Sequence, residues 1–332
     1  MAPHRLSLIV VVATASATFL AQRAPLPHRA RGVSLSLLAD APNADALLGQ
    51  VSSVTKDGLI AILPENRELA KVGVLLRFGG GSLGVIISER CGLYFAGTIE
   101  GTPPAKDESA TLLPRNLTVA PWDGRPASWG GLHDFLGRRV GESAAPMPTA
   151  PDADDGRPDV FGPPVSAAQR RPIGASLHTG VVAIDALAPI GRGQSMMLFG
   201  PDSLPAGAGR TDVALRAVRA QHELQSGVRS VVVLCEPNAA MREEALATMR
   251  DQGMLESVRV FEATNAIEAA IAASAACSLA EASVGSDDAL VVVDSLRPHL
   301  QLWRAICKAL KDAQVGAAPE DPNRVALPDS PP

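Results

Sequence analysis

RPIGASLHTGVVAIDALAPIGRGQ, residues Arg171–Gln194, precedes an apolar run and a glycine-rich segment, and from here on apolar runs alternate with helical patterns. The predicted strands are Ser195–Phe199, Val228–Leu234, Val258–Phe261 and Ala289–Asp294. The helices predicted to follow them are Thr211–Gln225, Ala239–Gln252, Ala266–Ala282 and Pro298–Ala313. Strand–helix repeats predict a parallel sheet covered by helices, an α/β domain that we place at residues 171–315.

A second, smaller domain is predicted upstream, at residues 41–100. Apolar and polar residues alternate there around two turn signals, Lys56–Gly58 and Gly79–Gly81. Short alternating strands with such turns favour a small antiparallel β-barrel. Residues 101–170 are rich in Pro, Gly and Asp and are predicted to be linker or irregular structure, and 316–332 a disordered tail.

The N-terminal segment, residues 1–40, has the composition of a targeting sequence. Residues 1–39 contain no Asp or Glu, and Leu6–Ala21 is an apolar run followed by Arg23, Arg29 and Arg31. A basic head, an apolar run and small residues are typical of a signal peptide, and the stretch after it is typical of a transit peptide. We therefore expect a plastid address, with a mitochondrial presequence as the alternative, and leave this segment out of the expected fold.

Composition excludes one class of partner. The formal net charge is −5, which argues against a nucleic-acid surface, and aromatic residues make up only 3%. The four cysteines, Cys91, Cys235, Cys277 and Cys307, lie far apart without the spacing of a metal site, and we predict buried free thiols.

The glycine-rich segment GPDSLPAGAGRT, Gly200–Thr211, is a candidate phosphate loop with an altered pattern. In G-x-x-x-x-G-K-[ST] the first glycine would stand at Leu204, and Arg210 stands where the lysine should be. Arginine keeps the charge but is a broad planar fork. The residues predicted to bind a nucleotide are Gly200, Gly207, Gly209, Arg210 and Thr211. The alternative is an ordinary glycine-rich turn between a strand and a helix.

Two acidic residues end predicted buried strands beside this loop. Asp294 follows ALVVV, where a carboxylate can hold a Mg²⁺-bound water, and the hydroxyl of Thr211 is the other predicted metal ligand. Glu236 follows VVVLC and is the candidate catalytic residue that polarises a water. The alternatives are a helix cap for Asp294 and a solvated strand-end carboxylate for Glu236.

These motifs resemble the alpha subunit of rotary proton-translocating ATP synthases. There Pro…TG…AIDAL…PIGRGQ leads through a strand to a Walker A loop, GQVSSVTKDGLIAI resembles the start of the N-terminal barrel, and ALVVVDSL resembles the Walker B strand. The resemblance covers roughly residues 47–312. It implies a RecA-like P-loop domain preceded by a small antiparallel β-barrel, ATP or ADP with Mg²⁺ as ligands, and beta-like and gamma-like head subunits as partners.

The departures from the family shape the expected function. The strand ending at Glu236 ends in Gln in alpha subunits and in a water-orienting Glu in catalytic beta subunits. After Leu310 nothing resembles the family's arginine finger or its C-terminal helical domain. We expect a divergent alpha-like subunit that serves proton-driven ATP synthesis structurally or as a regulator, without catalysis of its own. The alternatives are a stand-alone pseudo-ATPase assembly module and a small active ATPase.

The expected location is the stromal side of the thylakoid membrane, or alternatively the mitochondrial inner membrane. No transmembrane span is expected in the mature chain.

Overall fold

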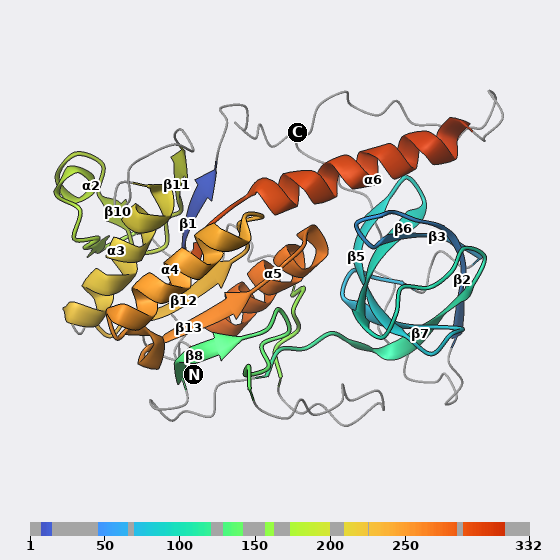
Figure 1. Ribbon diagram of the computed structural model, residues 1–332, viewed down its shortest axis with the longest axis horizontal. Coiled ribbons are helices and arrows are strands. Elements are labelled where there is room, and N and C mark those ends of the chain that lie inside the picture. Colours follow the sequence, from blue (N-terminus) through green and yellow to red (C-terminus); the bar gives the residue numbers. More distant parts are fainter. Residues whose placement is uncertain are drawn as a thin grey trace.

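The structure is a computed structural model with two packed bodies, a β-barrel and a parallel sheet covered by helices (Figure 1). The residues that it describes are 8–14, 46–65, 70–120, 129–141, 157–162, 173–199, 209–224, 226–283 and 288–315. This is the predicted fold class, a small antiparallel barrel before an α/β domain.

The barrel closes in the strand order β2-β3-β6-β5-β4-β7. Its strands are β2 (Ala46–Val54), β3 (Leu59–Pro64), β4 (Val74–Phe78), β5 (Leu83–Arg90), β6 (Leu93–Glu100) and β7 (Ser109–Asn116). Apolar side chains at alternate positions, such as Ile60 and Ile62, meet in one buried cluster. Gly58, in the predicted turn, has φ +82°, a conformation that favours glycine.

The barrel extends past residue 100, where the sequence places its end. Strand β7 pairs with β2 and β4 and so closes the barrel. Its alternation is short, and it lies in a region whose Pro, Gly and Asp content is typical of a linker. Pairing with distant strands gives this segment its structure.

The sheet of the α/β domain is parallel throughout, in the order β11-β1-β14-β12-β13-β8. Its strands are β11 (Met196–Phe199), β1 (Leu8–Thr14), β14 (Ala289–Val293), β12 (Arg229–Leu234), β13 (Val258–Glu262) and β8 (Gly131–His133). Four of these are the strands predicted from the sequence. β8 comes from the predicted linker, and β1 from the segment predicted to be a targeting sequence.

Helices cover both faces of this sheet (Figure 1). They are α3 (Arg210–Glu223), α4 (Ala239–Asp251), α5 (Ala266–Ser283) and α6 (Arg297–Val315). Side chains alternate along a strand, so Val232 joins the cluster that contains α3 and α4, and Val231 joins the cluster that contains α5 and α6. Burial of both faces explains the continuous apolar runs of β12 and β14.

Two further features bear on predictions from the sequence. Cys91 is exposed in a turn at φ +52°, so the prediction of a buried thiol is wrong there, whereas Cys235 is buried. A turn between antiparallel strands keeps the side chain of Cys91 at the surface. None of the helices in the described parts of the chain combines the length and the apolar character needed to cross a membrane.

Candidate functional site

The segment before β11 is held by its own polar side chains. Asp185, in helix α2 (Val182–Leu187), accepts hydrogen bonds from the backbone N–H and hydroxyl of Thr179, at 2.8 and 2.7 Å, and from Gly180 N–H at 3.1 Å. Desolvation acts to raise the pKa of Asp185, but these bonds outweigh it and lower the pKa. The Thr-Gly and Asp of the sequence motif therefore form one structural unit.

The PIGRGQ part of the motif forms a turn that is anchored to the sheet. The amide oxygen of Gln194 accepts a hydrogen bond from Gly191 N–H at 2.8 Å. Arg192 pairs with Asp288 at 2.7 Å, directly before β14. The short strands β9 (Ser176–Leu177) and β10 (Ile190–Gly191) pair within this segment. The motif thus fixes the approach to β11.

The phosphate-loop candidates split into two groups. Gly200 and Gly207 lie outside the described residues. Gly209 is the N-cap of α3, and Arg210 and Thr211 form its first turn, both half-buried. Because α3 follows β11, this turn lies at the carboxyl edge of the sheet, where parallel α/β folds bind ligands. The strand and the helix predicted on either side of the candidate loop are confirmed.

The first turn of α3 carries a carboxylate of its own, that of Asp212. Asp212 accepts a hydrogen bond from Gly209 N–H through Oδ2 at 3.0 Å. In a phosphate loop such an N–H, at the positive end of the helix dipole, is available to the anion. Here a bound phosphate has to compete with Asp212 for the same donor.

Asp294 lies at the carboxyl end of β14, is only 4% exposed, and ties β14 to β12. Its two carboxylate oxygens accept from Cys235 N–H at 2.7 Å and Glu236 N–H at 3.3 Å. Burial raises the pKa of Asp294 to about 6, with the nearby Glu236 charge acting in the same direction and the hydrogen bonds opposing it. Burial also raises the pKa of the Cys235 thiol, so this cysteine stays protonated.

Glu236, the candidate catalytic residue, is paired and nearly inaccessible. It is 5% exposed, and its Oε1 lies 3.3 Å from a guanidinium nitrogen of Arg297. Its backbone carbonyl accepts a hydrogen bond from Arg242 at 2.6 Å. A buried carboxylate neutralised by an arginine is poorly placed to polarise water. With so little exposure, Glu236 is not the solvated strand-end carboxylate of the alternative.

The sheet brings Glu236 and Asp294 together and places the first turn of α3 on the same edge. β11 and β14 both flank β1, so they stand about 9–10 Å apart by ordinary strand spacing. The described candidate residues therefore share one edge of the sheet, as a mononucleotide site requires.

The chemistry of this edge suits magnesium and phosphate only in part. Thr211 and Asp294 carry oxygen atoms of the kind that Mg²⁺ prefers, but both oxygens of Asp294 already accept backbone hydrogen bonds and its side chain is only 4% exposed. The guanidinium of Arg210 can contact phosphate. Asp212 opposes an anion, because it holds the N–H of Gly209 and adds negative charge. The residues thus fit a weakly held Mg²⁺–nucleotide complex once Asp212 has moved aside.

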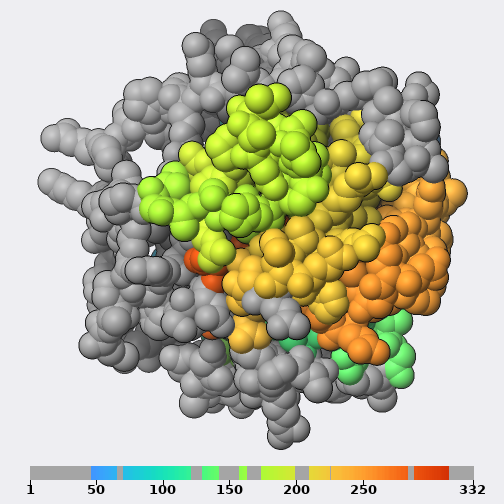
Figure 2. All heavy atoms as spheres, turned by 90° about the vertical axis from the view of Figure 1, so that its left-hand side faces the viewer, coloured from blue at the N-terminus to red at the C-terminus, as the bar shows by residue number. Residues whose placement is uncertain are grey.

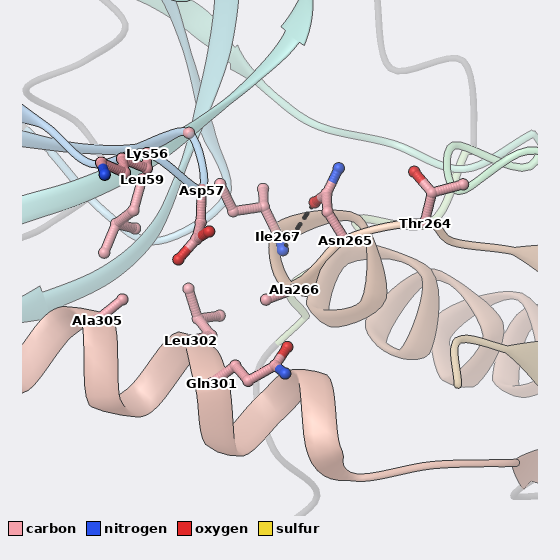
Figure 3. A pocket seen from close by; sticks show the side chains of 11 residues that line it. Lys56, Asp57, Leu59, Thr264, Asn265, Ala266, Ile267, Gln301, Leu302 and Ala305 are labelled. Carbon is pink, nitrogen blue, oxygen red and sulfur yellow. Dashed lines mark hydrogen bonds between the residues drawn. The ribbon is translucent and has the colours of Figure 1, made fainter. Parts of the chain in front are cut away.

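A separate cavity of about 700 Å³ lies between the barrel and the α/β domain (Figure 3). It is lined by the β2–β3 turn, the start of α5 and the middle of α6, including Lys56, Asp57, Asn265 and Gln301. Asn265 caps α5 by accepting hydrogen bonds from Ile267 N–H and Glu268 N–H, both at 3.0 Å. None of the predicted site residues lines this cavity.

The fold and site define a class, a barrel followed by an α/β domain of the mononucleotide-binding type, with acidic residues on the sheet edge where the first turn of α3 also lies. Residues 180–318 match the ATP synthase alpha/beta family, nucleotide-binding domain. The resemblance to ATP synthase alpha subunits predicted from the sequence is thereby confirmed, at modest identity.

Three relatives show how far the likeness reaches, and each is an ATP synthase subunit alpha. That of Caldanaerobacter subterraneus subsp. tengcongensis is 29% identical over 53% of this chain and 35% of its own length. That of Acetivibrio thermocellus is 31% identical over 45% of this chain and 29% of its own length. That of Kocuria rhizophila is 26% identical over 80% of this chain and 48% of its own length. The matched part of this chain thus covers less than half of each relative.

Sequence reasoning missed two residues that shape the site. Asp212 stands next to Thr211 in the sequence, and an acid three residues after an N-cap is a known signal for capping. Arg297 follows Asp294 by three residues, but nothing in the spacing indicates that it reaches Glu236 on another strand.

Proposed function

We propose that this protein is a divergent alpha-like ATP synthase subunit that binds Mg²⁺–ATP or Mg²⁺–ADP weakly and does not turn it over. One observation carries the proposal. The first turn of α3 and Asp294 share the carboxyl edge of a parallel sheet, while Glu236 beside Asp294 is paired with Arg297. Among the residues that the structure describes, the site retains parts for binding, and its candidate catalytic carboxylate, Glu236, is already paired.

The proposed role is structural or regulatory, in the head of a proton-translocating ATP synthase, beside beta-like and gamma-like subunits. Exposed apolar side chains support a protein partner. Val182 and Leu187 of α2 are 81% and 84% exposed, in the segment that lies beside α3 on the face shown in Figure 2. Contiguous exposed apolar surface marks protein interfaces, and both side chains belong to one six-residue helix.

We also propose an organellar location, on the stromal side of plastid thylakoids, with the mitochondrial inner membrane as the alternative. The acid-free, arginine-bearing N-terminal segment supports it. Mass spectrometry of ATP synthase purified from each organelle tests location and partnership together. Absence of the polypeptide from both complexes contradicts the proposal.

Binding and turnover are tested on the full chain with a fluorescent ATP analogue and Mg²⁺, followed by phosphate release. We expect binding without turnover. Arg210→Lys is expected to tighten binding, because a compact ammonium approaches phosphate more closely than a guanidinium. Arg216→Lys, on the same helix beyond its first turn, is the matched control. Sustained phosphate release supports a small ATPase and refutes the proposal.

A second candidate function, a pseudo-ATPase assembly module without bound nucleotide, is favoured by one contact. The Asp212 carboxylate already satisfies the N–H of Gly209. If neither the full chain nor the Arg210→Lys variant binds the analogue, this second function replaces the first.

A further inference from the structure

The strand β1 lies in the interior of the sheet although it comes from the N-terminal segment. Along one side, Val11 stands in register with Met196 of β11, and along the other with Val292 of β14. Both pairings are parallel. β1 also lies against α3 and α5, the helices that cover opposite faces of the sheet (Figure 1).

This position makes β1 the link between the two halves of the candidate site. β11 leads into the phosphate loop and α3, and β14 ends at Asp294. Among the residues that the structure describes, β1 is the one strand that hydrogen-bonds to β11. Without it, β11 keeps the packing of Met196 and Leu198 against the core but has no strand beside it.

We propose that Leu8–Thr14 is a positioning strand of the nucleotide site, which holds β11, and with it the first turn of α3, in register with β14 and Asp294. The inference rests on the proposed function. It also couples that function to N-terminal processing, because the same residues form the apolar part of the predicted targeting sequence. Removal of the N-terminal segment opens a slot with two unpaired strand edges, and β11 loses its fixed distance from β14.

The composition of this segment suits the slot. The strand reads LIVVVAT, which is β-branched at four of its positions before the final Thr and carries no charge. Interior strands of parallel sheets are continuous apolar runs of this kind. An apolar signal-like run and an interior strand have the same local pattern, so one segment can serve as both.

The first test is hydrogen exchange on the full chain, comparing Val11→Pro with Val11→Thr. Proline removes a ladder N–H, whereas threonine keeps it and is β-branched. In the proline variant we expect exchange at Met196–Phe199 to accelerate roughly fivefold to tenfold, which corresponds to losing one hydrogen bond of about 1 kcal/mol. Amides of the β12–β13 pair, such as Val232, serve as the internal reference. Unchanged protection at Met196–Phe199 overturns the inference.

Binding of the fluorescent ATP analogue with Mg²⁺ separates this inference from the proposed function. If the full chain binds and Val11→Pro binds at least about fivefold more weakly, both stand. If the full chain does not bind but exchange at β11 still depends on residue 11, the nucleotide function fails and the strand role stands. If the full chain and Val11→Pro bind equally and β11 is equally protected from exchange in both, the strand role fails and the nucleotide function stands.

A second test asks whether the chain's own segment fills the slot. A specific protease site inserted between Arg31 and Gly32 allows the folded full chain to be cut. We expect the N-terminal fragment to stay bound during gel filtration and β11 to stay protected. Loss of the fragment with protection unchanged overturns the inference.

Discussion

Asp212→Ala separates the stability of α3 from its capacity to bind an anion. In the structure Asp212 Oδ2 accepts from Gly209 N–H at 3.0 Å, the donor that a bound phosphate requires. A phosphate at that N–H would place its charge roughly 4 Å from the carboxylate. Two like charges at about 4 Å repel by about 1 kcal/mol in water and by about 4 kcal/mol near a protein surface.

Asp212 is half-buried, so we take about 1–2 kcal/mol from the lower part of that range. The Asp212→Ala variant is expected to bind the Mg²⁺–nucleotide analogue about 5- to 30-fold more tightly. The same substitution removes a favourable carboxylate from the first turn of α3 and is expected to cost about 1 kcal/mol of folding stability. Affinity and stability therefore move in opposite directions.

The measurements are fluorescence titration for affinity and urea unfolding for stability, both on the full chain. Glu223→Ala is the matched control, since it removes one negative charge from the other end of α3, where Glu223 pairs with Arg219 at 2.6 Å on the surface. We expect it to leave affinity unchanged and stability within about 0.5 kcal/mol. Unchanged or weaker binding by Asp212→Ala refutes the competition between Asp212 and phosphate.

Four further predictions concern pH, packing and partners. Burial raises the pKa of Asp294 to about 6, above its ordinary value of 3.8, so the folded state binds a proton more tightly than the unfolded state and gains stability as pH falls from 7 toward 4. In thermal melting, Asp294→Asn should lack this part of the dependence of stability on pH, and an identical dependence in both chains contradicts the raised pKa. Affinity for the Mg²⁺–nucleotide analogue should fall as pH drops through about 6, because a protonated Asp294 cannot hold a Mg²⁺-bound water; an affinity independent of pH between 7 and 5 argues against that role. A Cβ on Gly97 would lie 2.2 Å from Ile267 Cγ2, so Gly97→Ala is expected to cost about 1–3 kcal/mol in urea unfolding, and Ile267→Ala in the same chain to recover part of it; strict additivity of the two changes contradicts this contact. Leu187→Glu is expected to leave the melting temperature unchanged, because the side chain is 84% exposed, and to reduce recovery of the chain with ATP synthase subunits in affinity purification, with the exposed Leu63→Glu of the barrel as control.

Local pattern was sufficient for most of the fold. The boundaries of α3, α4, α5 and α6 lie within one or two residues of those predicted, because each helix carries its own start and stop signals. The barrel turns and the apolar strands β12 and β14 are equally local. The strand–loop–helix order around Gly209 and the strand-end positions of Glu236 and Asp294 follow from the same patterns.

The sequence by itself therefore determined the helices α3 to α6 and the strands β11 to β14, the type of each domain, and the family that the chain resembles. Only the tertiary structure decided which strands stand side by side: β1 between β11 and β14, β7 as the closing strand of the barrel, and β8 at the sheet edge. It also decided that Glu236 meets Arg297 and that Asp212 folds back onto Gly209. The physical reason is that periodicity reports a segment's own conformation, whereas strand order and ion pairing depend on which distant surfaces bury one another.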